Sequence, residues 1–382
     1  MGIFDSLLTG ILVFIILLGP LMFIHELGHF WAAKRAGIRV EEFGLGFPPR
    51  AITLGKRGDT TYTLNWLPIG AFVRMTGEEL PDDPHSFAAQ PKRWRLITLL
   101  AGPFMNFLGA FVILAVAYLF FATQPSEFRY RITSVREGGA AAAVGIKAGD
   151  VIVSANGVDL LQRLGDPGTG LSGLDVVPLK EQAQSAIGKE LTVVVDRPTD
   201  PASSNSYVQQ VELKGQIPAD VDFDTPLGVG IAAKVLKSDR IIYSAPQAFL
   251  MAGEDIVNVL TGIVRAPVEL IRQTMPAEMA RPVSVVGITQ MGVALIEDRD
   301  TQGLFPFIRF AGLISLVLGF TNLLPFPALD GGRILFIVIE WIRGRRVDPV
   351  REQWVHAVGM MILLGLSAVI IVLDIVRPIS FR

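Results

Sequence analysis

The sequence contains no cysteine among its 382 residues. That absence excludes disulfide bonds, metal sites built on thiolates and cysteine nucleophiles. Histidine is also scarce, since the chain has only four, at positions 25, 29, 85 and 356. A bound metal ion would therefore need histidine, aspartate or glutamate side chains, and few combinations of histidines are available.

A strong charge of one sign is absent as well. The formal net charge is −2, and neither a polybasic block nor an acidic tail occurs. The sequence thus has no electrostatic signature of nucleic-acid binding. Hydrophobic residues, in contrast, make up 51% of the chain. This share is high for a soluble protein and typical of a membrane protein that carries a polar domain.

Four apolar stretches are long enough to be membrane spans, at about 20 residues for one crossing. They cover approximately 7–33, 97–122, 304–324 and 355–376. The first 20 residues lack the positive start and the small-residue cleavage site of a signal peptide, so we interpret them as part of a retained span. We expect a polytopic α-helical membrane protein of about four spans.

Basic residues indicate how these spans are oriented. Lysine and arginine are concentrated between the first two apolar stretches and again between the last two. The positive-inside rule places both of these segments in the cytoplasm. Both termini and the long segment 124–303 would then lie outside the cytoplasm.

The first apolar stretch contains the polar sequence HELGH at residues 25–29. Side chains four positions apart share one face of a helix, so His25 and His29 would present two imidazoles to one point. Glu26 lies beside them and could take a proton from water activated by a metal, as in other H-E-x-x-H sites. Two histidines bonded to neighbouring helices are the alternative, but this alternative leaves the costly carboxylate of Glu26 unexplained.

A catalytic zinc ion needs a third protein ligand, and without cysteine this is expected to be a carboxylate. The sequence NLLPFPALDGG, residues 322–332, follows the third apolar stretch. Its prolines and glycines interrupt a helix, and irregular backbone at membrane depth is tolerated where it is buried or lines a cavity. Asp330 could there complete a metal site, or it could cap a helix at the cytoplasmic interface. The need of His25 and His29 for a carboxylate favours the metal site.

Taken in order, HELGH, a soluble insert and ALDGG after an Asn-Leu-Leu-Pro-x-Pro run resemble the site-2 protease family of intramembrane metalloproteases. The bacterial regulator-of-sigma-E protease branch is the most similar. The resemblance implies one zinc ion per chain, held by His25, His29 and Asp330, with Glu26 as general base. It also implies the cytoplasmic (inner) membrane of a bacterium, with the active site near the cytoplasmic side.

Two asparagines are further candidates. The second apolar stretch opens with AGPFMN, which is similar to a stretch next to the active site in the family. The resemblance implies that Asn106 orients the substrate or the oxyanion and that Asn322 holds the substrate backbone. From the residues alone, Asn106 is an interhelical hydrogen-bonding group and Asn322 a helix cap.

The cytoplasmic segment 40–80 predicts a β-hairpin. Tyr62, Leu64 and Trp66 alternate along one face, and GKRGD before them supplies the turn. Such a hairpin could be a small interfacial sheet with no part in the chemistry. In the family a similar membrane-associated sheet lies beside the active site, where its edge could pair with an extended substrate.

Between the second and third spans, GIKAGDVIVSANG and the strands around it resemble a single PDZ domain over 128–216. A PDZ domain could capture a peptide tail, and we expect it here to be a steric gate that refuses untrimmed substrates. The remaining segment, 217–303, is predicted to be an extracytoplasmic linker. An amphipathic helix within 240–275 is expected to lie on the outer membrane surface, with a fifth span as the alternative. The membrane core would then consist of 1–127 and 304–382.

The expected function is zinc-dependent cleavage of transmembrane segments in single-pass membrane proteins. Anti-sigma factors and remnant signal peptides are examples of such substrates, cut for a second time after their ectodomains have been trimmed. The alternative is a non-catalytic membrane protein that binds metal and recruits partners through its PDZ domain. Degenerate proteins of that kind typically lack the glutamate or the aspartate, whereas this chain has both.

Overall fold

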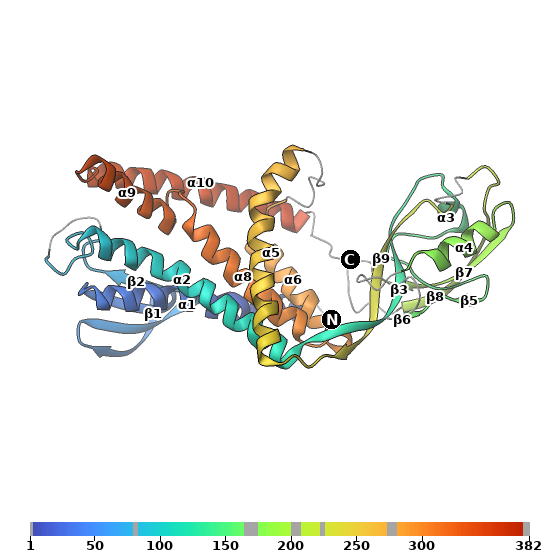
Figure 1. The fold of residues 1–382 in the computed structure, drawn as a ribbon, viewed down its shortest axis with the longest axis horizontal. Helices are drawn as coiled ribbons and strands as arrows, with labels where there is room; N and C mark the ends of the chain where they lie inside the picture. The colour runs from blue at the N-terminus through green and yellow to red at the C-terminus, as the bar shows by residue number, and fades with distance from the viewer. Residues whose placement is uncertain are drawn as a thin grey trace. The chain divides into compact units, whose positions relative to one another are not determined.

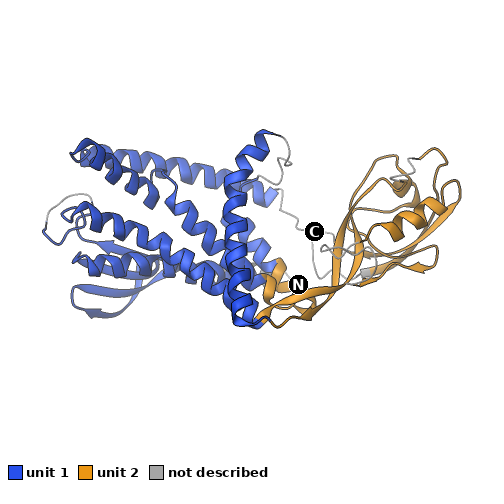
Figure 2. Ribbon diagram, in the orientation of Figure 1, with its two compact units in different colours: residues 1–120, 243–293, 307–379 blue, residues 121–242, 294–306, 380–382 orange. Residues whose placement is uncertain are grey.

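A computed structural model of the chain describes residues 3–78, 83–163, 175–199, 208–221, 226–272 and 281–376. The chain forms two compact units, which Figure 2 colours separately. The first, here called the helical unit, comprises the residues up to Phe120, Tyr243–Val293 and the residues from Phe307 onward. The second, the sheet unit, comprises Phe121–Ile242 and Ala294–Pro306.

Long apolar helices dominate the helical unit (Figure 1). Five described helices are long and apolar enough to cross a membrane, and all except α5 coincide with apolar stretches predicted from the sequence. These five are α1 (Ile3–Arg35), α2 (Lys92–Val116, followed by a π-helical turn over Ala117–Phe121), α5 (Ala245–Ile271), α8 (Phe305–Leu323) and α10 (Pro349–Val376). The helical unit also contains α9 (Asp330–Arg343) and most of α6 (Val285–Glu297), whereas α7 (Arg299–Gln302) lies in the sheet unit.

Much of the apolar surface of these helices is not covered by protein. In the most apolar 18-residue stretch of α10, only 11% is buried inside the protein, and in the corresponding stretch of α1 only 28% is buried. Soluble proteins rarely expose contiguous apolar surface of this extent. The exposed faces are therefore suited to contact with lipid, as expected of helices that cross a bilayer.

Helix α5 differs from the other long helices in its direction. In Figure 1 it runs across α2 and α10 rather than along them. Its buried face carries Asp255, which accepts hydrogen bonds from the Tyr118 hydroxyl at 2.9 Å and from Arg309 at 2.6 and 2.7 Å. Its other face exposes apolar side chains such as Val257 and Val264. This arrangement supports the interfacial orientation proposed for the segment 240–275, which remains a prediction.

Helices α1, α2 and α8 approach one another closely at glycines. A Cβ atom at Gly28 of α1 would lie 2.2 Å from the carbonyl oxygen of Ala101 in α2. A Cβ atom at Gly319 of α8 would lie 3.0 Å from the carbonyl oxygen of Pro103, also in α2. Small residues of this kind let helix backbones pack closely within a membrane. The close approach sets the HELGH face of α1 against the AGPFMN segment of α2.

The predicted hairpin is present, formed by β1 (Val40–Arg57) and β2 (Thr60–Met75). Gly58 and Asp59 form its turn, and Gly58 has a φ of +61°, a conformation that glycine adopts without steric cost.

Bulges divide these two strands into shorter segments. Val40–Leu45 pairs with Thr61–Leu64 on one side and with Ala71–Met75 on the other. We call Ala71–Met75 the edge segment, because no other described strand pairs with its outer side. This edge could pair with another extended chain, although the Met75 amide already donates to Oε1 of Glu78 at 3.4 Å.

Several apolar side chains of this sheet are exposed, and several polar ones are buried next to the apolar Val40, Phe43 and Ala71. Leu64 and Trp66 are 40% and 70% exposed, whereas Thr63 and Asn65 between them are buried. Further apolar side chains exposed on these strands are Phe47, Ile52, Leu54 and Leu67. The exposed apolar side chains favour contact of this sheet with the membrane.

The buried carboxylate of Glu42 joins the segments of the sheet. It accepts a hydrogen bond from the Thr63 hydroxyl at 2.7 Å. It also forms ion pairs with Arg50 at 2.9 Å and with Arg74 at 3.3 Å. Burial acts to raise the pKa of Glu42, but the Thr63 and Arg50 hydrogen bonds and the charges of Arg50 and Arg74 lower it below its usual value. The ionised carboxylate therefore stabilises the sheet.

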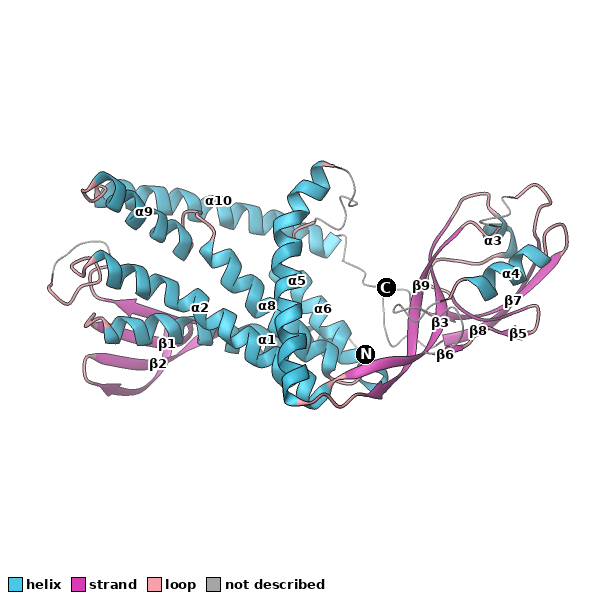
Figure 3. Cartoon of the chain, in the orientation of Figure 1, coloured by secondary structure: helices cyan, strands magenta, loops and turns pink. Residues whose placement is uncertain are grey.

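The sheet unit contains a seven-stranded antiparallel sheet (Figure 3). Five strands run in the order β6-β3-β4-β7-β8, β5 pairs with β4, and β9 pairs with β3. The bounds are β3 Thr123–Val135, β4 Val151–Ala155, β5 Val158–Asp159, β6 Gln162–Arg163, β7 Glu190–Pro198, β8 Val208–Gln216, β9 Val229–Arg240, α3 Ala140–Val144 and α4 Val177–Ser185. One apolar cluster, which includes Tyr130, Ile152 and Val193, forms the core.

Strand β9 was not predicted from the sequence, which assigned its residues to a linker. It pairs with β3 along nearly its whole length, from Thr123 opposite Arg240 to Val135 opposite Val229. Its side chains are mostly half-buried or exposed, so apolar alternation gives little signal. The PDZ assignment and its bounds, 128–216, remain predictions.

We expect Glu42→Gln to destabilise the hairpin by about 1–3 kcal/mol, because a buried charge-assisted hydrogen-bond network is broken. Thermal unfolding of the purified protein and limited proteolysis of the hairpin measure this effect. Stability contributed by Glu42 should be present above its usual pKa and lost as the pH falls through its lowered folded-state value. The variant should lack this dependence.

Glu41→Gln is the matched control for this prediction, since Glu41 is the exposed neighbour of Glu42 on β1. Equal stability and equal pH dependence in both variants would show that Glu42 does not hold the sheet together.

Candidate metal centre

His25 and His29 lie one helical turn apart on α1, and both are buried. Their Nε2 atoms are 3.1 Å apart. The Oδ2 atom of Asp330, from a distant part of the sequence, lies 3.2 Å from each of them. The structure thus brings together the three residues predicted to hold a metal ion, and they form the one such cluster among the residues described.

An interruption between two helices brings Asp330 to this place. Helix α8 ends at Leu323, and α9 begins at Asp330 itself. The prediction placed the aspartate within the irregular stretch, whereas it is the first helical residue after it. A Cβ atom at Gly331 would lie 2.2 Å from the Leu324 carbonyl oxygen, and one at Gly332 would lie 2.3 Å from that of Phe326. Only glycine fits at these two positions.

The interruption also contains a residue in an uncommon conformation. Ala328 has a φ of +76°, in the left-handed region, which costs a residue with a Cβ atom about 1–2 kcal/mol. Such a conformation persists only where the surrounding structure holds it.

The three donor atoms fit a zinc ion. Distances of 3.1–3.2 Å between them are close to the edge, about 3.3 Å, of a tetrahedron with zinc–ligand bonds of about 2.0–2.1 Å. The Oδ2 atom of Asp330 is buried and has no hydrogen-bond partner in the described structure. Two imidazole nitrogens and a carboxylate oxygen facing one another are electron-rich, and a shared cation satisfies all three. Two histidines and one carboxylate are a common ligand set of catalytic zinc.

A backbone group fixes the orientation of His29. Its Nδ1 atom lies 2.7 Å from the carbonyl oxygen of Thr98 in α2. A carbonyl oxygen only accepts hydrogen bonds, so Nδ1 carries the proton and Nε2 presents a lone pair toward Asp330. Metal-binding histidines are oriented in this way in most metalloproteins.

The amide of Asn106 lies against the other histidine. Its Nδ2 atom is 3.1 Å from His25 Nδ1, and its buried Oδ1 atom has no partner in the described structure. Rotating the amide by 180° would satisfy both groups, because Oδ1 would then accept a proton from His25 Nδ1 and leave Nε2 free for a metal. Asn106 is therefore in contact with a candidate ligand, and its predicted role in substrate binding remains a prediction.

Glu26 and Asn322 have different surroundings. Glu26 is half-buried on α1, where its carboxylate lies within hydrogen-bonding reach of the backbone of Val73 in the edge segment. Asn322 donates from Nδ2 to the carbonyl oxygen of Leu318 at 3.0 Å, within its own helix. The proposed substrate contact of Asn322 remains a prediction.

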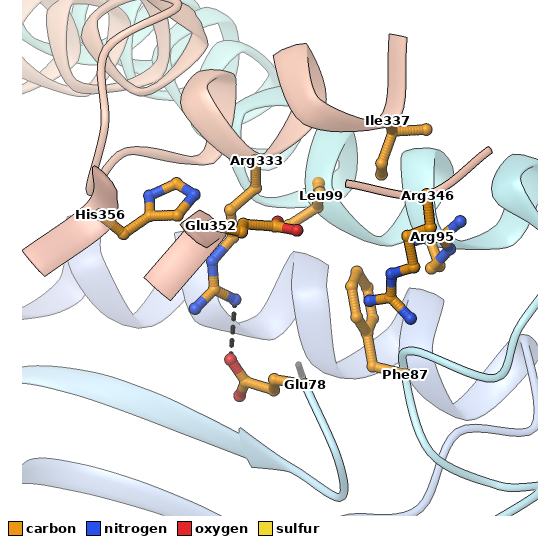
Figure 4. Close-up of a pocket in the computed structure, with 9 residues that line it drawn as sticks. All are labelled: Glu78, Phe87, Arg95, Leu99, Arg333, Ile337, Arg346, Glu352 and His356. Atoms are coloured by element: carbon orange, nitrogen blue, oxygen red, sulfur yellow. Dashed lines mark hydrogen bonds and ion pairs between the residues drawn. The ribbon is translucent and has the colours of Figure 1, made fainter. Parts of the chain in front are cut away.

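A small pocket lies near this centre. Its lining does not include the candidate site residues His25, Glu26, His29 and Asp330. Its volume of about 40 Å³ is sufficient for a few water molecules. Figure 4 shows Arg333, one turn after Asp330, bound to Glu78 across it; its Nη1 atom donates to Oε2 of Glu78 at 2.7 Å. The lining residues are Glu78, Phe87, Arg95, Leu99, Arg333, Ile337, Arg346, Glu352 and His356.

Sequence reasoning missed three contributors to the centre. The Thr98 carbonyl could not have been found, because every residue has one. The position of Gly102 against the ligands depends on how α1 and α2 pack, which no local pattern indicates. The contact of His356 with the Asp330 loop joins residues 28 positions apart and leaves no local signal either.

Gly102 of α2 leaves the space that the two histidines occupy. A Cβ atom there would lie 2.3 Å from Nε2 of His29 and 2.9 Å from Cε1 of His25. We expect Gly102→Ala to lower zinc affinity by about 10–100-fold, as loss of ligand orientation does in other sites. Competition with a chromogenic chelator measures this affinity.

The matched control is Gly109→Ala on the same helix. A Cβ atom at Gly109 would make only ordinary contacts, with Ile24 at 3.4 Å as the nearest. Unchanged zinc affinity in Gly102→Ala would contradict the proposed ligand geometry.

Comparison with known proteins agrees with this centre. Residues 13–366 match the model of peptidase family M50. A Clostridium acetobutylicum protein, provisionally named a zinc metalloprotease, is 28% identical over 373 residues, which cover 97% of this chain and 99% of that protein. Zinc metalloprotease RasP of Shouchella clausii is 26% identical over 456 residues, 98% of this chain and 100% of that protein. Regulator of sigma-W protease RasP of Bacillus subtilis is 26% identical over 451 residues, 96% of this chain and 98% of that protein.

These matches extend over nearly the whole chain, and they confirm the predicted enzyme class and the predicted zinc cofactor. The apolar helices agree with a protein that crosses the membrane several times. The chain belongs to peptidase family M50, the site-2 proteases, and is an intramembrane zinc metalloendopeptidase.

Proposed function

We propose that the protein cleaves peptide bonds within the transmembrane segments of single-pass membrane proteins. One observation carries this proposal: the donor atoms of His25, His29 and Asp330 converge beside Glu26 in the first long apolar helix. A hydrolytic centre at this depth acts on bonds that are themselves inside the membrane.

The residues of the centre have separate roles in the proposed reaction. His25, His29 and Asp330 would hold zinc, which supplies a Lewis acid and lowers the pKa of water to about 7. Glu26 accepts the proton of the attacking water and returns it to the nitrogen of the leaving amine. Its place directly after the first ligand keeps the carboxylate next to the centre without making it part of the ligand set.

The edge segment, Ala71–Met75, is the proposed docking site for the scissile region. It has an unpaired outer side among the described strands, and Val73 lies beside Glu26. An extended peptide could add to this edge as a further strand. A transmembrane substrate would first have to unwind near the cut, since a helix keeps its carbonyl groups bonded within itself.

We further propose where the enzyme lies and which substrates it takes. The basic segments between the spans support a cytoplasmic active-site end, in the inner membrane of a bacterium. The Bacillus subtilis relative is named as a protease that regulates a sigma factor, and this favours membrane-bound anti-sigma factors as substrates. Remnant signal peptides share the same single-span chemistry and remain the second candidate.

For the insert 128–216 we propose a PDZ domain that acts as a steric gate. A folded domain before the active-site helices would exclude substrates with bulky ectodomains, so that cleavage follows trimming. Capture of a peptide tail is the alternative role. A non-catalytic scaffold is the alternative for the whole protein, and the presence of Glu26 together with the three ligands counts against it.

Glu26→Gln should retain zinc and lose cleavage by about 10²–10⁴-fold, the usual contribution of a general base. Metal analysis of the purified protein and cleavage of a reconstituted single-span substrate measure the two effects. Glu41 is an exposed carboxylate on β1, so Glu41→Gln should leave zinc content and cleavage unchanged. Retained cleavage in Glu26→Gln would show that the general base is another residue.

The gate can be tested by replacing residues 123–240 with a short Gly-Ser linker. The ends of this segment are adjacent, since the amide of Ile241 donates to the carbonyl oxygen of Ala122 at 2.9 Å. We expect faster cleavage of a substrate that retains its ectodomain and unchanged cleavage of a trimmed one, both measured on gels. An equally slow reaction with the untrimmed substrate would refute the gate.

A further inference from the structure

The loop that delivers Asp330 is irregular, although some of its backbone groups bond to one another, such as the Phe326 amide to the Leu324 carbonyl oxygen at 2.7 Å and the Leu329 amide to the Phe326 carbonyl oxygen at 3.2 Å. Between the end of α8 and the start of α9, residues 324–329 contain turns and bends but no helix or strand. Ala328, two positions before the ligand, has the left-handed conformation described above. None of the described bonds within the loop uses the Ala328 amide, so a contact from outside the loop is needed to hold this residue in its uncommon conformation.

His356 of α10 makes the contact that holds it. The backbone amide of Ala328 donates a hydrogen bond to Nδ1 of His356 at 2.9 Å. Because Nδ1 accepts this bond, the neutral ring carries its proton on Nε2. Nδ1 is thus already engaged, and His356 is not part of the cluster formed by His25, His29 and Asp330.

A second contact on the same turn of α10 reinforces the first. A Cβ atom at Gly359 would lie 2.3 Å from Cβ of Pro327 and 3.0 Å from its carbonyl oxygen. The His356 ring also packs against Phe336 of α9, with 5.4 Å between the ring centres. Since the remainder of α10 is largely exposed, this turn is the part of the helix that meets the Asp330 loop.

We infer that His356 is a positioning residue of the metal centre, which acts by holding the backbone of Ala328 so that Asp330 faces the two histidines. The inference rests on the proposed assignment of His25, His29 and Asp330 as zinc ligands. Loss of the acceptor would leave the Ala328 amide unpaired and release its left-handed conformation. Asp330 would then lose its fixed distance from His25 and His29.

Packing alone is the competing explanation, because His356 also lines the pocket in Figure 4 and contacts Phe336. Two substitutions separate the explanations. His356→Phe keeps a ring against Phe336 but removes the acceptor. His356→Asn removes the ring but places an amide oxygen near the position of Nδ1.

The probe is zinc itself, titrated against a chromogenic chelator with the full-length protein in detergent. We expect His356→Phe to bind zinc about 10–100-fold more weakly, in the range typical of lost outer-shell contacts, and His356→Asn to stay close to wild type. The visible absorption of the cobalt-substituted protein should change in His356→Phe alone. His85→Phe is the control, since His85 is exposed and bonds to Asp83.

A second pair of variants tests the same loop if His356→Phe does not fold. Gly359→Ala should press on Pro327 and weaken zinc binding. Gly365→Ala, where a Cβ atom would have no neighbour within 4 Å, should not. Equal zinc affinity in these two variants would count against the loop as the controlling element.

Three results would overturn the inference: wild-type zinc affinity in His356→Phe, a loss confined to His356→Asn, or an equal loss in both variants. The last two would assign the effect to packing. Failure of the proposed function looks different, because wild-type protein would then bind no zinc at this centre and Glu26→Gln would cleave normally.

Discussion

Three electron-rich atoms held 3.1–3.2 Å apart within apolar helices form the constraint on which the other features of the helical unit depend. In a medium of low dielectric constant, a positive charge shared among these atoms, such as that of a metal ion, offsets their mutual repulsion. Their convergence requires two helix backbones in near contact, which Gly28 and Gly102 permit. It also requires a helix that stops, so that Asp330 can enter from a third direction. The geometry of the metal site and the packing of the helices therefore depend on the same residues.

The β1–β2 sheet meets a related requirement in a different way. Buried polar groups around Glu42 join its segments, and apolar side chains such as Trp66 are exposed. The exposed apolar side chains suit contact with the membrane, whereas the unpaired edge would need to face protein, water or a substrate strand. The edge segment can then lie beside Glu26 without a covering layer.

Features that depend on residues close together in the sequence could be predicted from it, whereas features that depend on contacts between distant residues could not. His25, Glu26 and His29 follow from helix periodicity, and the hairpin follows from a Gly-Asp turn, because both signals are local. Asp330 was found through chemical need, since two histidines require a third ligand. Strand β9, the Thr98 carbonyl and the contacts of Asp255 depend on distant partners and leave no local pattern. Role assignments for Asn106 and Asn322 come from resemblance, and they remain predictions, since the structure shows only the contacts of these amides with protein groups.

Helix α10 has polar anchors at two levels, which constrains how its sequence can vary. Near one end His356 holds the Asp330 loop, and near the other Asp374 accepts hydrogen bonds from Arg281 and Ser284. Between them most side chains face outward and require only to be apolar. Substitutions among leucine, isoleucine and valine should therefore accumulate freely along most of this helix. Only a few polar and small residues of this helix would be constrained by specific contacts. Overall sequence identity along α10 is therefore a poor guide to whether a related chain retains a working metal centre.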